Sequence, residues 1–129
     1  MKSVTKEIKI KHYNEVLFGF QVIEKNEEPS VEISVLLDVP YHAPESSYKE
    51  LIKERSKLDR PQASVEVKYS ELLANYDGVQ RFVGSFIRRV YRELNDKLLK
   101  EYGRGLMPFM QTNISIGLKE LLPKYDSGS

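Results

Sequence analysis

The chain of 129 residues contains no cysteine, and this absence removes several classes of protein at once. Without cysteine there is no disulfide framework, no thiol nucleophile, no cysteine-ligated zinc and no iron–sulfur cluster. A chain of this length buries enough apolar surface to fold without such cross-links. We therefore expect an ordinary hydrophobic core and no cofactor.

Long apolar runs are also missing. No stretch approaches the roughly 20 consecutive apolar residues of a membrane helix, and residues 1–11 are charged and alternating, unlike a signal peptide. Hydrophobic residues make up 40% and charged residues 30% of the chain, which is typical of globular proteins. We expect a soluble, cytoplasmic protein with no membrane partner.

The sequence also lacks the motifs of common catalytic and phosphate-binding sites. It has no G-x-S-x-G elbow, no G-x-x-x-x-G-K-[ST] loop and no G-x-G-x-x-G fingerprint. His12 and His42 lie in predicted turns without a second ligand at fixed spacing, which predicts capping or solvent-facing side chains and no metal site. An enzyme whose acid and base come from distant residues is the alternative, because spacing does not reveal such a pair. We expect a protein that is not an enzyme.

The clearest pattern that is present covers residues 77–103. Apolar residues recur there at intervals of three and four, which predicts a helix with one apolar face. Asp77 and Gln80 have the spacing of a capping box, and Gly103 supplies a left-handed stop, so we predict a helix over residues 79–102. At about 1.5 Å per residue this helix spans about 36 Å, enough to cross a small domain.

Alternating apolar and polar residues predict an antiparallel meander before this helix. Three such runs cover residues 8–11, 16–22 and 31–37, and turn residues separate them. A weaker run over residues 63–69 indicates a fourth strand, although Tyr69 equally begins a possible helical turn. We predict a three- or four-stranded antiparallel sheet packed against the long helix.

Two further helical segments are predicted. Residues 47–59 carry a narrow apolar stripe with Ser47 at its start in capping-box spacing. Residues 117–122 predict a last helical turn that is closed by Pro123. The chain as a whole is thus predicted to be one α+β domain, residues 1–125, followed by a frayed tail, residues 126–129.

The predicted core combines alternate strand residues with the apolar stripe of the long helix. It comprises Ile8, Ile10, Phe18, Phe20, Val22, Ile33, Val35, Leu37, Phe82, Phe86, Val90 and Leu94. The opposite face of the sheet is not purely polar, because Leu17, Ile23 and Leu36 interrupt it, whereas a half-exposed sheet alternates cleanly. We expect the following helix, a loop or a second copy of the chain to cover these three candidate protein-binding residues, and we expect a homo-oligomer.

Positive charge concentrates on the long helix, where residues 81–104 carry seven Lys or Arg against three Asp or Glu. Arg81, Arg88 and Arg92 fall within roughly 40° of one another on a helical wheel, opposite the apolar stripe. A ridge of this kind can follow phosphates, although acidic residues one turn away are placed to pair with most of these arginines. Nucleic-acid binding through the ridge is therefore the alternative function.

The carboxyl-terminal third resembles the SecB-type export chaperones. The residues that carry the resemblance are Phe86 to Arg89, Gly105 to Pro108, and Ile114 to Ile116 running into Leu118, Leu121 and Leu122. The resemblance implies a holdase without enzymatic activity that assembles as a tetramer and grips unfolded chains in apolar grooves. The chain departs from the family in its longer helix, in a predicted helix where the family has sheet, and in its charge balance, so no site residue is transferred.

The absence of catalytic motifs and the partly apolar second sheet face together favour recognition over chemistry. We expect a non-catalytic protein-binding module, that is an adaptor, an inhibitor or a chaperone-like protein. Its expected partner is another protein or an unfolded polypeptide.

Overall fold

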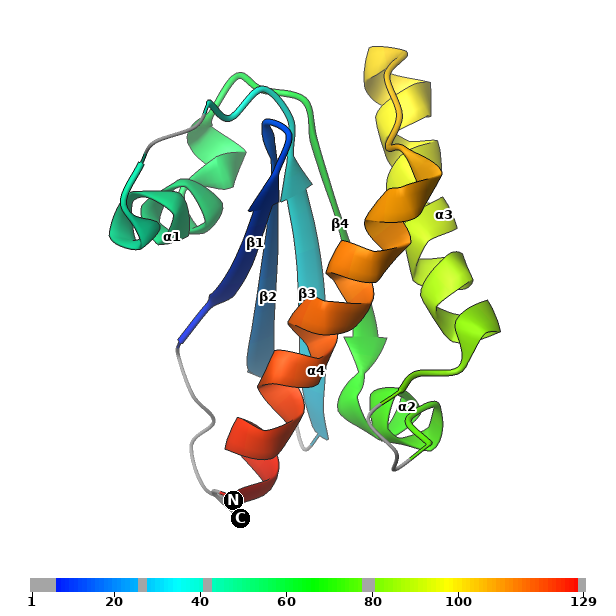
Figure 1. The fold of residues 1–129 in the computed structure, drawn as a ribbon. Coiled ribbons are helices and arrows are strands. Elements are labelled where there is room, and N and C mark those ends of the chain that lie inside the picture. Colours follow the sequence, from blue (N-terminus) through cyan, green and yellow to red (C-terminus); the bar gives the residue numbers. More distant parts are fainter. Residues whose placement is uncertain (1–6, 26–27, 41–42, 78–80, 128–129) are drawn as a thin grey trace.

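Four antiparallel strands form one sheet, and helices lie on both of its faces (Figure 1). The computed structural model describes residues 7–25, 28–40, 43–77 and 81–127. The elements in chain order are β1 (Lys9–Tyr13), β2 (Val16–Lys25), β3 (Glu28–Leu36), α1 (Glu45–Lys53), η1 (Arg55–Lys57), β4 (Gln62–Lys68), α2 (Tyr69–Ala74), α3 (Gly84–Tyr102), η2 (Pro108–Met110) and α4 (Gln111–Ser127). The predicted α+β fold is confirmed, and the strands of the sheet follow the order β1-β2-β3-β4.

A two-residue turn joins β1 to β2. Tyr13 lies opposite Val16, so that Asn14 and Glu15 alone form the turn. Both have positive φ, 53° and 64°, which is the backbone that matches the twist of a tight hairpin. This turn fixes which residues of β2 face each side of the sheet, because side chains alternate along a strand.

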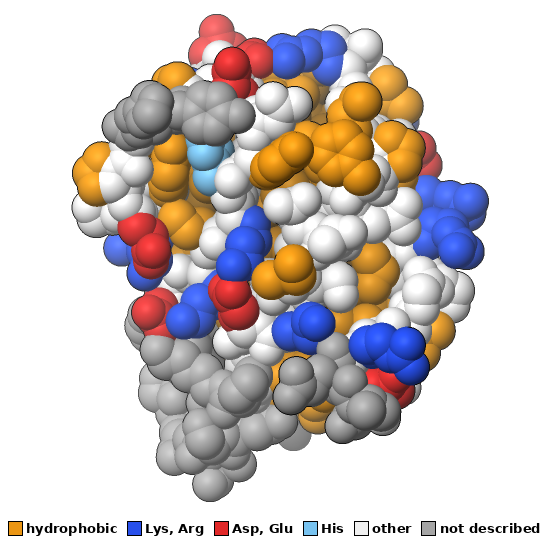
Figure 2. Space-filling view, in the orientation of Figure 1, with side chains coloured by type: hydrophobic (Ala, Val, Ile, Leu, Met, Phe, Trp, Pro, Cys, Tyr) orange, Lys and Arg blue, Asp and Glu red, His pale blue; other side chains and the backbone are white. Residues whose placement is uncertain are grey.

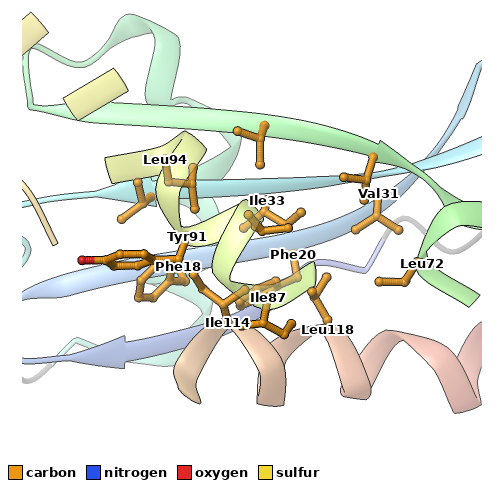
Figure 3. Close-up of a cluster of buried hydrophobic side chains, with 14 of the residues drawn as sticks. Phe18, Phe20, Val31, Ile33, Leu72, Ile87, Tyr91, Leu94, Ile114 and Leu118 are labelled. Atoms are coloured by element: carbon orange, nitrogen blue, oxygen red, sulfur yellow. The ribbon is translucent and has the colours of Figure 1, made fainter. Parts of the chain in front are cut away.

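The larger of two cores lies between the first face of the sheet and the helices α3 and α4 (Figure 3). Phe20 and Ile33 are fully buried there, together with Leu94 of α3 and Leu118 of α4. Gly117 of α4 lies directly against the Phe20 ring, where an added Cβ would overlap the ring atoms. The close approach of α4 to the sheet therefore depends on glycine at this position.

A smaller core lies on the second face, beneath α1. Leu17 and Leu36 are completely buried there against Tyr48 and Ile52 of α1. Of the covers expected for this face, the structure shows the helix that follows β3. The interpretation of Leu17 and Leu36 as residues open to a partner is therefore corrected, since α1 occupies their surface.

The predicted core residues are buried with one exception. Ile10 is half-buried, and it packs with Ile8 against the smaller core rather than the larger one. Phe82 is buried in the larger core although it precedes α3. The alternation of the strands thus indicated burial correctly, but not which of two cores each residue joins.

The long helix is shorter at its start than predicted. α3 begins at Gly84 and ends as expected at Gly103, whose φ of 71° is left-handed. Asp77 caps no helix: its N–H donates to the Arg81 carbonyl at 2.8 Å, and its Oδ1 accepts from the Arg81 N–H at 3.1 Å. These bonds join Asp77 to Arg81 ahead of α3. Gln80 lies outside the described residues.

The shorter helix also differs from its prediction at both ends. α1 begins at Glu45 with Pro44 as its N-cap, so Ser47 lies inside the helix and does not cap it. The segment predicted as helix to residue 59 ends as the 3₁₀ turn η1 at Lys57. The fourth strand is confirmed as β4, and Tyr69 begins α2 directly after it.

The last helix is much longer than the predicted single turn. α4 runs through Gly117 and past Pro123 to Ser127, so the predicted end at Pro123 is wrong. Asp126 and Ser127 of the predicted tail are helical, and residues 128–129 lie outside the described part of the chain. No helix among the described residues is both long and apolar enough to cross a bilayer.

Candidate protein-binding surface

The segment of residues 103–110, which we call the connector, joins α3 to α4 and includes η2. Gly103 turns the chain with a left-handed φ of 71°. Gly105 then packs so tightly against α3 that an added Cβ would overlap Asn95 Oδ1. The Gly103-Arg104-Gly105 sequence therefore does more than end a helix, because its second glycine lets the connector lie back against α3.

Two hydrogen bonds, one buried and one partly buried, hold the connector at Leu106. The Tyr91 hydroxyl donates to the Leu106 carbonyl at 2.8 Å, and the Leu106 N–H donates to Asn95 Oδ1 at 2.7 Å. Burial raises the pKa of Tyr91, so its hydroxyl stays protonated and remains a donor over a wider pH range. The Leu106 side chain is thereby held in the core, while the side chain of Met107 beside it is exposed.

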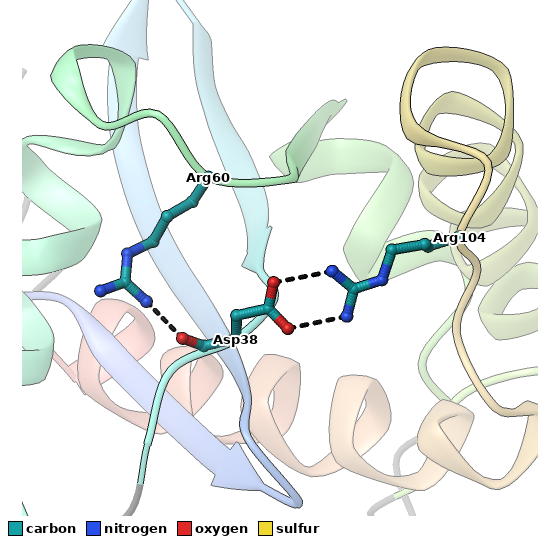
Figure 4. A network of polar contacts seen from close by, with 3 residues as sticks. All are labelled: Asp38, Arg60 and Arg104. Carbon is teal, nitrogen blue, oxygen red and sulfur yellow. Dashed lines mark hydrogen bonds and ion pairs between the residues drawn. The ribbon is translucent and has the colours of Figure 1, made fainter.

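An ion pair ties the connector to Asp38, which follows the end of β3 by two residues (Figure 4). Arg104 donates from both guanidinium nitrogens to the two carboxylate oxygens of Asp38, each at 2.7 Å. Arg60 donates to the Asp38 backbone carbonyl, and the φ of Asp38 is 62°, in the left-handed region. The hydrogen bonds from Arg104 lower the pKa of Asp38 and, reciprocally, raise the pKa of Arg104.

Large apolar side chains project to solvent from this fixed connector. Met107 and Phe109 are 53% and 49% exposed, and Tyr13, in the neighbouring β1–β2 hairpin, is 49% exposed. The Tyr13 and Phe109 rings meet edge to face, with centroids 5.6 Å apart. We call these three residues the connector patch. Figure 2 shows apolar side chains gathered over this upper part of the face.

A small cavity of about 200 Å³ opens beside the connector patch. Buried Val16, Leu37 and Met110 contribute apolar walls, and Arg104 and Met107 also line it. Its volume is below the roughly 300–1,000 Å³ of pockets that hold small-molecule ligands. The cavity is suited to a single side chain of a larger partner.

The structure does not bring the three predicted protein-binding residues into this surface. Leu17 and Leu36 are buried under α1 on the other face of the sheet, and Ile23 is half-buried. Tyr13 and Phe109, which do form a surface, stand 96 positions apart in a chain of 129 residues. Periodicity carries no signal for such a pair. The local signal for this surface was the pair Met107 and Phe109 on either side of Pro108, directly after the glycine-rich turn.

The predicted basic ridge is altered by the late start of α3. Arg81, Arg88 and Arg92 are all exposed, but Arg81 precedes the helix and pairs with Asp77 at 3.4 Å. Arg88 and Arg92 lie one turn apart on α3, and neither has an ion pair with another residue in the described part of the chain. The partners expected one turn away along α3 are not used. Arg89, for example, pairs with Glu71 of α2 instead.

The histidines form no metal site that the structure describes. His12 is half-buried, its Nε2 lies 2.8 Å from the Val39 carbonyl oxygen, and its ring stacks on Tyr48 at 4.6 Å. His42 lies outside the described residues. Within the described ranges, no group of three or more His, Cys, Asp or Glu side chains is arranged to hold a metal ion.

No protein-family model, curated protein or solved structure matches this chain. The resemblance to SecB-type chaperones therefore stays a prediction. The fold and the geometry of the connector are the observations that support a functional proposal.

Proposed function

We propose that this protein is a non-catalytic, chaperone-like binding module that holds extended or unfolded polypeptide segments against the connector patch. The observation that carries the proposal is the exposure of Tyr13, Met107 and Phe109 side by side on a fixed backbone. Half-exposed aromatic and thioether side chains grouped in this way are typical of protein-interaction surfaces.

The connector is held in place before any partner arrives. Leu106 is anchored by Tyr91 and Asn95, and Arg104 is held by Asp38. A surface that is already ordered loses little conformational entropy on binding, so more of the apolar burial appears as affinity. Met107 adds a flexible side chain that adapts to different apolar partners.

An extended polypeptide fits this surface better than a small molecule does. The cavity of about 200 Å³ accepts one side chain, while the patch beside it accommodates neighbouring residues of the same segment. Arg104 and Asp38 place charged groups near the cavity, where a peptide backbone finds polar partners. The resemblance to SecB-type chaperones points to the same class of ligand.

The proposal is tested by the capacity to bind an unfolded protein and to suppress its aggregation. We expect Met107→Ser combined with Phe109→Ser to weaken binding of a reduced, alkylated model protein by about tenfold or more, since central apolar residues dominate such interfaces. Leu73→Ser combined with Val83→Ser is the matched control. These residues are 41% and 44% exposed; Leu73 lies in α2, and Val83 is the N-cap of α3.

Wild-type affinity in the connector variant, or an equal loss in the control, would contradict the proposal. Light scattering on the same proteins measures self-association. We propose that the chain forms a homo-oligomer, and the connector variant shows whether the same patch joins the copies.

Nucleic-acid binding is the second candidate. It is favoured by Arg88 and Arg92, which are exposed and form no ion pair with a residue that the structure describes. Its test is the affinity for mixed single- and double-stranded DNA and RNA at low and moderate salt. A salt-sensitive affinity that is lost in an Arg81→Ala, Arg88→Ala, Arg92→Ala variant would support this candidate over the first. Binding that is weak and unchanged in the variant would remove it.

A further inference from the structure

β4 is an edge strand, because β3 pairs with one side of it and no described strand pairs with the other. Leu37 N–H donates to the Pro61 carbonyl at 2.9 Å, in the register that places Leu36 opposite Gln62. Backbone groups alternate in direction along an antiparallel pair. The backbone N–H and C=O groups of Gln62 and Ser64 therefore point away from β3, toward the free edge of the sheet.

One side chain lies on this outer edge. Lys97 of α3 donates from Nζ to the Ser64 backbone carbonyl at 2.6 Å. The ammonium occupies the position that an N–H of an added strand would take. Lysines at sheet edges protect an edge from unwanted pairing. Because Lys97 is exposed, exchanging it for another donor requires no rearrangement of the core.

A groove of about 590 Å³ opens between this edge and the last turns of α3. Figure 1 shows β4 running beside α3 along this side of the molecule. The groove is lined by Gln62, Ala63, Ser64, Lys97, Lys100 and Glu101. Lys100 is exposed and forms no ion pair with a residue that the structure describes, so cationic groups outnumber the single carboxylate here.

We propose that the outer edge of β4 binds an extended, acidic polypeptide segment as an additional strand in the groove beside α3. The inference goes beyond the proposed function, because the groove shares no lining residue with the connector patch, and it names the conformation and charge of the segment that this second site takes. The incoming backbone N–H replaces Lys97 on the Ser64 carbonyl. The released Lys97 and the neighbouring Lys100 then face a carboxylate of the segment.

The exchange explains why an acidic segment is preferred over a neutral one. Adding a strand restores the hydrogen bond that Ser64 loses, so this step alone has little net effect. A carboxylate on the segment gives the displaced ammonium a new partner, and Lys100 adds a second cation nearby. Backbone pairing thus supplies the binding mode, and the two lysines supply the selectivity.

The probe is a capped, fluorescent peptide of alternating Thr and Val that carries Glu at its centre, titrated into the full-length protein. We expect N-methylation of the alternate amides that face β4 to weaken binding by about tenfold. Replacing Glu by Gln should weaken it by about threefold. That preference should vanish in a Lys97→Met, Lys100→Met variant.

Ser64→Pro is the matched change in the protein. The Ser64 N–H points outward, so proline removes an edge donor without breaking the ladder with β3, and we expect about tenfold weaker binding. If circular dichroism shows this variant unfolded, the N-methylated peptide decides alone. Equal binding of the methylated peptide, equal binding of the Glu and Gln peptides, or no binding to the wild type overturns the inference.

The connector variant separates this inference from the proposed function. Unfolded protein that binds Met107→Ser with Phe109→Ser as tightly as the wild type removes the proposed function. Acidic peptide that binds Ser64→Pro and the connector variant as tightly as the wild type removes the edge site.

Discussion

The two faces of the sheet are built differently. The first face packs against α3 and α4 in a large core that includes Phe20 and Leu94, whereas the second face carries a small core beneath the single short helix α1. Arg55, just after α1, also pairs with Glu32 of β3 at 2.7 Å on the second face. The first face holds the fold together, and the second is a local unit that apolar and ionic contacts attach to it.

This difference also separates the surfaces that each side presents. The connector patch lies at the end of the helical layer over the first face, where rigid support exists for exposed apolar residues. On the second face, α1 covers Leu17 and Leu36, so these two residues form no exposed apolar patch. The proposed recognition surface therefore lies on the side of the molecule with the larger core.

The largest expected effect comes from breaking the first face at its centre. Phe20→Ala removes a fully buried ring that touches Gly117 of α4, and we expect a loss of about 3–5 kcal/mol in the free energy of unfolding. Urea denaturation measures this loss. Phe109→Ala, at an exposed ring, is the control and should change stability by no more than about 0.5 kcal/mol. Similar losses in both variants would contradict this account of the core.

A smaller and local effect is expected on the second face. Ile52→Ala empties the space where the Ile52 side chain sits 2.8 Å from an ideal Cβ position at Gly19. We expect a cost of about 2 kcal/mol, at the low end for such changes, because α1 can settle into the gap above the glycine. Hydrogen exchange should speed up in α1 and stay unchanged in α3. Faster exchange throughout α3 would mean that the two cores are not separate units.

The third effect tests how the connector is attached to the first face. Tyr91→Phe keeps the ring but leaves the Leu106 carbonyl without its hydroxyl donor, and we expect a loss of about 1 kcal/mol. Hydrogen exchange at Leu106 should rise, while α1 keeps its protection. An unchanged rate at Leu106 would show that the connector is held by other contacts.

The smallest effect concerns the ion pair between the end of β3 and the connector. The pKa of Asp38 is lowered in the folded state by its hydrogen bonds with Arg104, so its stabilising contribution is present above the unfolded-state value of about 3.9. It is lost as the pH falls through the folded-state pKa. Asp38→Asn should therefore lower the urea midpoint at pH 7, and this effect should shrink as the pH falls below the unfolded-state value. Asn tolerates the left-handed backbone that Asp38 adopts.

Asp59→Asn, at an exposed carboxylate, is the control for this pH dependence. A loss in Asp38→Asn that persists at acid pH would assign the effect to the backbone of residue 38 rather than to its charge. Added salt should reduce the difference between wild type and Asp38→Asn at pH 7, since exposed ion pairs are screened.

The sheet was predictable because its pattern is local. Alternation in β2 and β3 indicated the strands, and Gly103 indicated the end of α3. Asp77 and Gln80 had capping-box spacing, yet Asp77 forms its hydrogen bonds with Arg81 and α3 begins later. Spacing alone does not specify which backbone groups a capping side chain reaches. Tertiary contacts decided that outcome.

The last helix and the candidate surface depended on contacts that no local pattern encodes. Residues 117–122 predicted only one turn closed by Pro123, but α4 runs from Gln111 to Ser127, and Gly117 lets this helix lie directly on the Phe20 ring. Tyr13 and Phe109 meet only because the β1–β2 hairpin and the connector end up at the same edge of the fold. Sequence reasoning placed the elements, and packing then brought the candidate surface together.

The most direct measurement is a residue-resolved NMR titration of the whole protein with an alkylated, unfolded protein. The account predicts that backbone and methyl signals of Tyr13, Met107 and Phe109 shift with a common saturation curve, while those of α1 stay in place. Shifts confined to α1 and the second sheet face, or no shifts at a concentration that suppresses aggregation, would contradict it.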